Sequence, residues 1–128
     1  MSRPVCAIIG IGPGNGAAFA RYFSNAGYPL ALLARSTHLS LKLADSLGDA
    51  RAYACDAADP KAIEVTFAEV RRDLGPVDVL IYNAGSGSWK DIEEITADEF
   101  ELGWRINTLG AMVASQQVIP DMKQAGRG

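Results

Sequence analysis

Short apolar runs alternate along the chain with segments in which apolar residues recur every three or four positions. The runs are Val5–Ile9, Leu30–Ala34, Val77–Tyr82 and a weaker candidate at 50–55. A short unbroken apolar run is typical of a strand buried on both faces of a parallel sheet. We therefore predict four strands, of which Val77–Tyr82 is the most clearly buried.

Helical spacing separates these runs, which predicts helices that each bury one apolar face. The expected faces are Phe19, Tyr22, Phe23 and Ala26, then Leu39, Leu43 and Leu47, then Ile63, Phe67, Val70 and Leu74. Ser36 or Thr37 can cap the second helix, and Asp59 followed by Pro60 is a strong start for the third. Glycines follow all three segments, as expected at helix ends.

A fourth and longer helix should begin at a capping box formed by Thr96 and Glu99. We expect one side of it to carry Phe100, Gly103, Asn107, Gly110 and Ala114, so that Asn107 lies on a buried face. Pro120 should kink or end this helix.

Strands that alternate with amphipathic helices predict an α/β fold with helices on both faces of a parallel sheet. Right-handed crossovers and the usual strand order 3-2-1-4 give one half of a Rossmann-like doubly wound sheet. The 128 residues fit one domain, 1–128, and we find no linker or repeat.

Composition narrows the possible functions. A net charge of −3 argues against nucleic acid or an anionic membrane as partner, and the apolar runs are too short to span a bilayer. The N-terminus lacks the features of a signal peptide, so we expect a cytoplasmic protein.

Cys6 and Cys55 belong to strands two positions apart, too far for a disulfide. The sequence contains no metal-ligand cluster, and its one histidine, His38, is expected to be exposed at the start of the second helix.

A glycine-rich turn joins the first strand to the first helix, at residues 10–16. A helix N-terminus offers free N–H groups and the positive end of a dipole, and glycine lets a phosphate approach the backbone. The candidate pyrophosphate-binding residues are Gly10, Gly12, Pro13, Gly14, Asn15 and Gly16. The spacing is G-x-x-x-G-x-G and not G-x-G-x-x-G; the alternative is a turn that only reverses the chain.

Three further features follow the second, third and fourth strands. Ala34 stands where a ribose-binding acid would favour NAD, and Arg35 next to it can pair with the 2′-phosphate of NADP. Asp56 follows the third strand, and Asn83-Ala84-Gly85 follows the fourth. Taken singly, these are also a strand-end arginine and ordinary turn residues.

In this order and spacing, the motifs resemble the short-chain dehydrogenase/reductase family from Val5 to about Met122. The resemblance implies that Asp56 binds the adenine amino group, that Asn83 braces the sheet, and that Ala84 and Gly85 leave room for the cofactor. It implies that Asn107 is a catalytic residue, supporting a proton relay through a water; the alternative is a polar residue on a helix flank. Ile9 replaces the threonine that family members often have.

The family's catalytic pair, Tyr-x-x-x-Lys, is absent from the 128 residues, because Tyr22, Tyr28, Tyr53 and Tyr82 are followed four positions later by Ala, Leu, Ala and Ser. We therefore expect a truncated N-terminal part of an NADP(H)-dependent oxidoreductase of carbonyl or alcohol substrates, incomplete at its C-terminal side and inactive alone. The complete protein should form homo-oligomers, as the family does. The alternatives are a non-catalytic dinucleotide-binding module and a degraded remnant.

Overall fold

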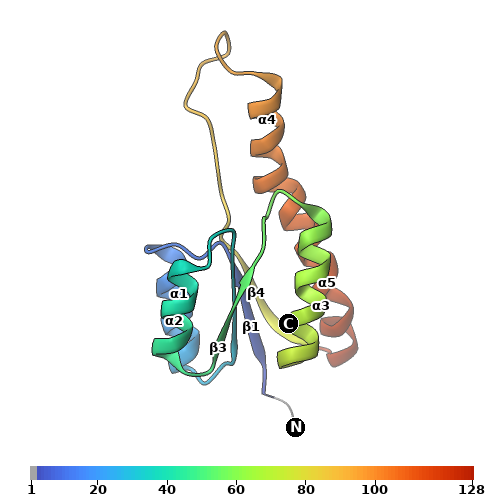
Figure 1. The fold of residues 1–128 in the computed structure, drawn as a ribbon. Helices are drawn as coiled ribbons and strands as arrows, with labels where there is room; N and C mark the ends of the chain where they lie inside the picture. The colour runs from blue at the N-terminus through green and yellow to red at the C-terminus, as the bar shows by residue number, and fades with distance from the viewer. Residues whose placement is uncertain (1–2) are drawn as a thin grey trace.

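The computed structural model describes residues 3–128, which form a parallel sheet flanked by helices (Figure 1). The elements are β1 (Val5–Ile9), α1 (Asn15–Asn25), β2 (Leu30–Ala34), α2 (His38–Leu47), β3 (Ala50–Ala54), α3 (Pro60–Leu74), β4 (Val77–Tyr82), α4 (Ala97–Trp104), the π-helical turn η1 (Arg105–Leu109) and α5 (Gly110–Ala125). All strand pairs are parallel, in the order β3-β2-β1-β4. The predicted fold class and strand order are confirmed.

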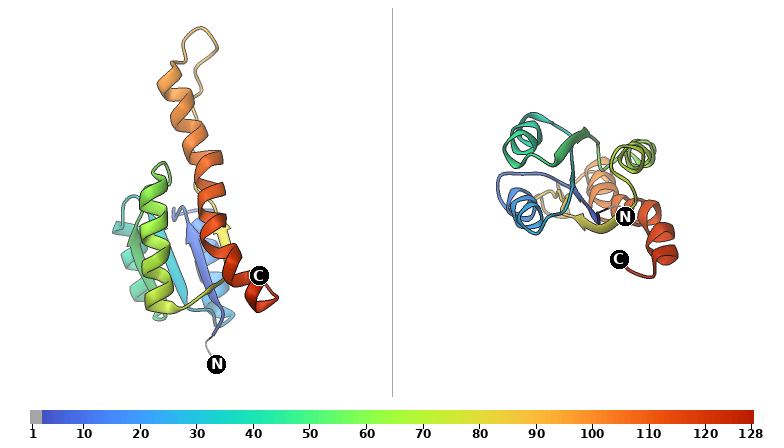
Figure 2. Two further views of the ribbon diagram at one scale, coloured as in Figure 1. Left: turned by 90° about the vertical axis from the view of Figure 1, so that its right-hand side faces the viewer. Right: turned by 90° about the horizontal axis from the view of Figure 1, so that it is seen from below.

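The sheet separates two apolar cores. Viewed from below, α1 and α2 cover one face while α3 and α5 cover the other (Figure 2). Side chains alternate along a strand, so Val5, Ala7 and Ile9 enter the core under α3 and α5, whereas Cys6 and Ile8 enter the core under α1 and α2.

Burial within the sheet follows strand position. Every residue of β1 and β2 is buried, but in β4 only Val77 is. The prediction that β4 is the most clearly buried strand is wrong, because β4 lies at the edge and pairs with β1 alone. The apolar side chains of β4 are therefore only partly buried, because no second strand lies on its outer edge.

The buried face of α1 also differs from the prediction. Gly16, Ala17 and Ala20 face the sheet, whereas Phe19 and Tyr22 are exposed. Small residues let the helix backbone approach the strands closely. The spacing of large apolar residues does not predict that small residues will face the sheet. Phe23 is half-buried and packs edge-on against Tyr28.

The helix starts vary in how they are capped. Asp59 accepts hydrogen bonds from two backbone amides of α3, and Thr96 and Glu99 form the expected capping box at α4. Thr37 occupies the N-cap position of α2, but its side chain makes no capping hydrogen bond among the described residues. Of the two outcomes expected at Pro120, a helix end is wrong, because α5 continues to Ala125.

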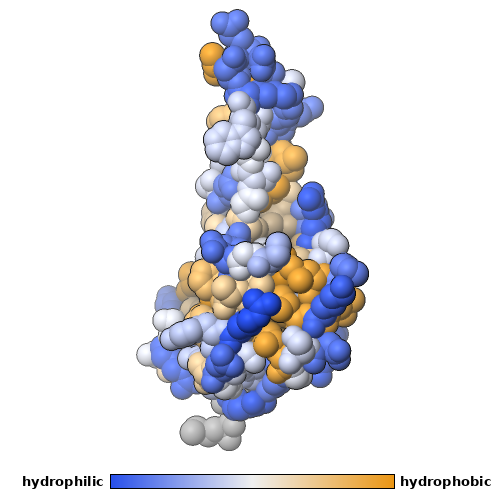
Figure 3. Space-filling model, turned by 90° about the vertical axis from the view of Figure 1, so that its left-hand side faces the viewer, coloured by the Kyte–Doolittle hydropathy of each residue, from blue (hydrophilic) through white to orange (hydrophobic). Residues whose placement is uncertain are grey.

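Residues 86–104 form an arm that projects beyond the sheet (Figure 1). It consists of an irregular segment followed by α4, of whose described residues none is buried. In the space-filling view the end of the arm is largely hydrophilic, while hydrophobic surface gathers on the body below it (Figure 3). The arm is therefore supported mainly through its continuity with η1 and α5.

Within residues 3–128 the two cysteines form no disulfide. Cys6 lies in β1 and Cys55 directly follows β3, so β2 lies between them. Both thiols are buried and free. No helix within residues 3–128 is long and apolar enough to cross a membrane.

Candidate functional site

A cleft of about 480 Å³ lies at the carboxyl edge of the sheet, where the loops after all four strands meet. It is lined by Ile9, Gly10, Ile11, Gly12, Asn15, Gly16, Ala34, Arg35, Ser36, Cys55, Asp56, Ala57, Asn83, Ala84, Gly85, Ser86, Leu102 and Ile106. Most of the site residues predicted from sequence therefore lie together. Pro13 and Gly14 belong to the same turn but do not line the cleft, and Asn107 lies beside it.

Two glycines are required by the packing of the turn itself. Gly10 has φ +98°, and a Cβ there would come within 2.6 Å of the carbonyl carbon of Asn83. A Cβ on Gly16 would lie 2.6 Å from the carbonyl oxygen of Gly10. These glycines bring β1, the start of α1 and the segment after β4 into close contact.

The other two glycines have no such internal reason. At Gly12 and Gly14 an added Cβ would meet no described atom within 4 Å, and neither residue has positive φ. The turn is thus bare on its outer side, next to the start of α1. That helix has no side-chain cap among the described residues and no acidic residue in its first turn. Open backbone beside an uncapped helix N-terminus fits a phosphate group.

Asn83 fastens the end of β4 to the end of β1. Its Nδ2 donates to the carbonyl oxygen of Gly10 at 3.0 Å, and its backbone N–H donates to that of Ile9 at 2.8 Å. The side chain and the backbone of Asn83 therefore both hold the start of the glycine turn in place. This geometry agrees with the bracing role that the resemblance implied.

Arg35 and Asp56 lie at the end of the cleft formed by β2 and β3. Arg35 is exposed and directly follows Ala34, the last residue of β2. One carboxylate oxygen of Asp56 accepts from the backbone N–H of Ala58 at 2.9 Å, so this residue does form the turn that was its alternative interpretation. The carboxylate also remains exposed beside the cleft.

Asn107 is exposed, so the expectation of a buried face is wrong. Its amide clamps the backbone of Ser86: Oδ1 accepts from the N–H at 3.1 Å, and Nδ2 donates to the carbonyl at 2.5 Å. The same side chain borders a neighbouring cavity of about 370 Å³ between the arm and η1, together with Ser86 and Trp104. Asn107 thus joins the helix to the loop that follows Asn83-Ala84-Gly85.

Sequence reasoning missed the wall of the cleft made by Leu102 and Ile106. The two residues are four positions apart on a continuous helical segment, which is the spacing of one helix face. The sequence pattern instead predicts that the buried face of this helix runs through Phe100 and Asn107. Ile11 was also missed, because within a glycine-rich turn a single apolar residue carries no periodic signal.

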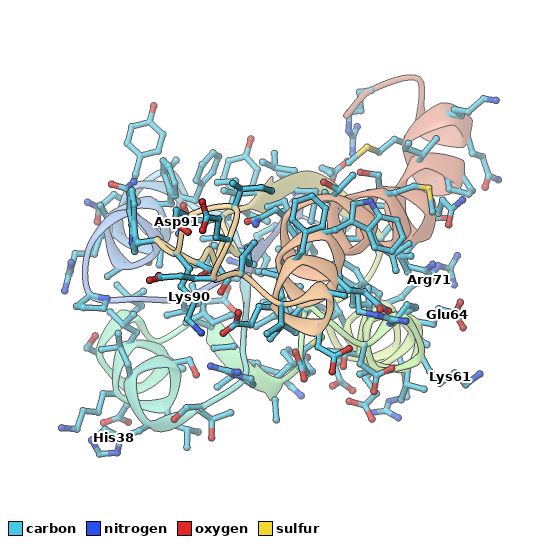
Figure 4. All side chains as sticks on the ribbon, turned by 90° about the horizontal axis from the view of Figure 1, so that it is seen from above. His38, Lys61, Glu64, Arg71, Lys90 and Asp91 are labelled. Carbon is cyan, nitrogen blue, oxygen red and sulfur yellow. The ribbon has the colours of Figure 1, made fainter. Side chains whose placement is uncertain are left out.

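Cys55 lines the cleft next to Asp56. Burial raises the pKa of Cys55, which keeps its thiol uncharged at neutral pH. His38 is exposed at the first position of α2 and lies at the periphery, as Figure 4 shows. Among residues 3–128 no three histidine, cysteine, aspartate or glutamate side chains gather as a metal site would require. The cleft thus combines bare backbone in the middle, a guanidinium at one end and an apolar wall at the other.

Comparison with known proteins gives a consistent family. The model of the short chain dehydrogenase family matches residues 4–128. The 3-oxoacyl-[acyl-carrier-protein] reductase of Mus musculus is 30% identical over 123 residues, which cover 95% of this chain and 52% of that protein. The chain thus spans about half the length of the curated relatives it matches.

Solved structures agree in fold. A metagenomic short-chain oxidoreductase in complex with NADP superposes with a TM-score of 0.91 at 26% identity, covering 99% of this chain and 60% of the other. NAD⁺-bound xylitol dehydrogenase gives a TM-score of 0.89 at 30% identity, covering 99% of this chain and 51% of the other. Similar folds therefore hold either dinucleotide.

Proposed function

Because the chain belongs to the short-chain dehydrogenase family, we propose that it is the dinucleotide-binding part of an NADP(H)-dependent oxidoreductase for a carbonyl or alcohol substrate. One observation carries the proposal: a single cleft collects the glycine turn, Arg35, Asp56 and the segment after β4. Such a crevice, at the carboxyl ends of parallel strands, is where doubly wound proteins bind nucleotides.

The cofactor would lie across the sheet edge, with its pyrophosphate on the bare turn at Gly12 and Gly14. The residues proposed to bind it are Gly10, Gly12, Pro13, Gly14, Asn15, Gly16, Arg35, Asp56, Asn83, Ala84 and Gly85. The nicotinamide, which supplies the hydride chemistry, would face Ser86 and Ile106. Asn107 is the proposed catalytic residue, with a part in a proton relay that remains a prediction. Its two hydrogen bonds to Ser86 would hold the loop beside the nicotinamide.

The preference for NADP over NAD rests on the end of β2. Ala34 offers no carboxylate for the ribose hydroxyls, and the exposed Arg35 beside the cleft can form a bidentate pair with a 2′-phosphate. A relative known with bound NAD⁺ shares the fold, so the preference depends on this position and not on the architecture.

Titration calorimetry of the chain with NADPH and NADH tests the proposal. We expect Arg35→Ala to weaken NADPH by about tenfold or more, since a charge-assisted bidentate contact is worth about 1.5–3 kcal/mol, with little change for NADH. Arg21→Ala is the matched control, because Arg21 is an exposed arginine of α1 that does not line the cleft. Equal losses for both nucleotides would refute the assignment of NADP.

A second candidate is a non-catalytic dinucleotide-binding module, favoured by the absence of Tyr-x-x-x-Lys from the 128 residues. For this chain alone we expect binding without turnover, tested by following NADPH absorbance with a panel of ketones and aldehydes. Turnover by the 128-residue chain would contradict this and would require another proton donor. Failure to bind either nucleotide in a folded sample would contradict both candidates.

A further inference from the structure

Tyr82, the last residue of β4, sends its side chain across to the helical segment that carries Asn107. Its hydroxyl donates a hydrogen bond to the backbone carbonyl oxygen of Ile106, in the π-helical turn η1. Burial raises the pKa of Tyr82, so the hydroxyl keeps its proton and remains a donor at neutral pH. Nothing in the proposed cofactor contacts assigns this residue a part.

The bond coincides with a local change in the helical hydrogen-bond pattern. In an α-helix the N–H of Gly110 would donate to the carbonyl oxygen of Ile106, four residues earlier. Here it donates to that of Arg105, one residue further back. The Tyr82 hydroxyl therefore donates to the carbonyl oxygen that the N–H of Gly110 would use in a regular α-helix.

Packing around Gly110 leaves this hydroxyl little freedom. A Cβ at Gly110 would collide with the Tyr82 hydroxyl, and it would also lie 2.5 Å from the carbonyl oxygen of Ala57. Gly110 is buried at the start of α5. The glycine thus makes room for a contact among β4, the loop after β3 and the π-turn.

The π-turn places two groups that matter to the cleft. Ile106 lines the cleft wall, and Asn107, the next residue, holds the backbone of Ser86 by two hydrogen bonds. A regular α-helix would rotate these side chains relative to α5, because a π-turn adds one residue to the helical path.

We propose that Tyr82 is a positioning residue, whose hydroxyl keeps η1 in its π-helical form and so holds Asn107 on Ser86 at the nicotinamide end of the cleft. The inference rests on the proposed function for its meaning in cofactor binding. Its structural part, the link from Tyr82 to Asn107, stands on hydrogen bonds within this chain.

Binding of two ligands to the Tyr82→Phe variant can show whether the hydroxyl positions the nicotinamide end of the cleft or only stabilises the fold as a whole. NADPH would use the whole cleft, whereas 2′,5′-ADP would use only the end near Arg35. We expect Tyr82→Phe to weaken NADPH about fivefold, the effect of about one neutral hydrogen bond, and to change 2′,5′-ADP by less than about twofold. The control is Tyr53→Phe, which also deletes a strand tyrosine hydroxyl, here one that donates to Asp73 at 3.0 Å.

Side-chain amide signals in ¹H–¹⁵N spectra provide a readout that needs no ligand. The Asn107 amide should lose its protection from exchange and shift in Tyr82→Phe, but not in Tyr53→Phe. The Asn83 amide, bonded to Gly10, is the internal control and should change in neither variant.

Each outcome decides the matter. Selective loss of NADPH together with a changed Asn107 signal supports the inference. An unchanged Asn107 signal, equal losses of NADPH and 2′,5′-ADP, or the same effects from Tyr53→Phe would overturn it. If the unmodified chain binds neither ligand, the proposed function fails, while the spectra still test the link between Tyr82 and Asn107.

Discussion

The glycine turn gives the sharpest prediction, because two of its glycines, Gly10 and Gly12, are needed for different reasons. Gly10→Ala places a methyl group 2.6 Å from the carbonyl carbon of Asn83, in a backbone with φ +98°. The positive φ alone costs about 1–2 kcal/mol for a residue with a Cβ. Displacing the backbone of residues 83–84 adds about 1–3 kcal/mol, by analogy with an overpacked core.

The sum, about 2–5 kcal/mol, is a large part of the stability expected for a domain of this size, about 5–15 kcal/mol. Gly12→Ala is the matched change at an open position, where no described atom lies within 4 Å of the added Cβ. It should leave stability unchanged or raise it by up to about 1 kcal/mol, because alanine reduces the entropy of the unfolded chain. The same methyl group would obstruct the pyrophosphate.

Urea unfolding followed by circular dichroism gives the two stabilities, and calorimetry gives the two affinities for NADPH. We expect Gly10→Ala to lower the unfolding midpoint strongly, and Gly12→Ala to weaken NADPH about tenfold or more while remaining folded. Undiminished stability of Gly10→Ala would refute the close approach at residues 83–84. Undiminished affinity of Gly12→Ala would show that the phosphates do not lie on this turn.

Three other changes test separate features. Asn83→Ala removes the bond to the carbonyl oxygen of Gly10 and should cost about 1–3 kcal/mol of unfolding free energy in urea titrations, with weaker NADPH binding; an unaltered midpoint would contradict the bracing role. The side-chain hydrogen bond from Lys90 holds the pKa of Glu99 below its ordinary value, so its contribution to stability is present at neutral pH and is lost as pH falls through the folded-state pKa. The melting temperature of Glu99→Gln should therefore fall less steeply below about pH 5 than that of the unmodified chain, and parallel curves would contradict the pairing. Burial raises the pKa of Cys6 to about 12, so a thiol reagent at pH 8 should modify it only after urea unfolding; rapid reaction in the folded state would contradict its burial.

Features set by local chemistry could be predicted from the sequence. Asp59 followed by Pro60, and the capping box at Thr96, act within four residues, and both helices begin where expected. The glycine turn and the residues after each strand could be placed in one cleft because parallel strands all end at the same edge.

Features set by distant neighbours could not. Whether Phe19 or Ala20 of α1 faces the sheet depends on how closely the helix approaches the strands. The partial exposure of β4 depends on the number of its partners, not on its apolar residues. Asn107 could be singled out, but it contacts Ser86 from within a π-turn, which no spacing of apolar residues predicts.

Because the side chains of β1 alternate between two cores, the strand should tolerate an inserted pair of residues better than a single inserted residue. Val5, Ala7 and Ile9 belong to one core, and Cys6 and Ile8 to the other. Inserting one residue at the start of this strand would send each following side chain to the opposite face, whereas inserting two would restore the original sides. A one-residue insertion should therefore destabilise the fold far more than a two-residue insertion, although it lengthens the chain less.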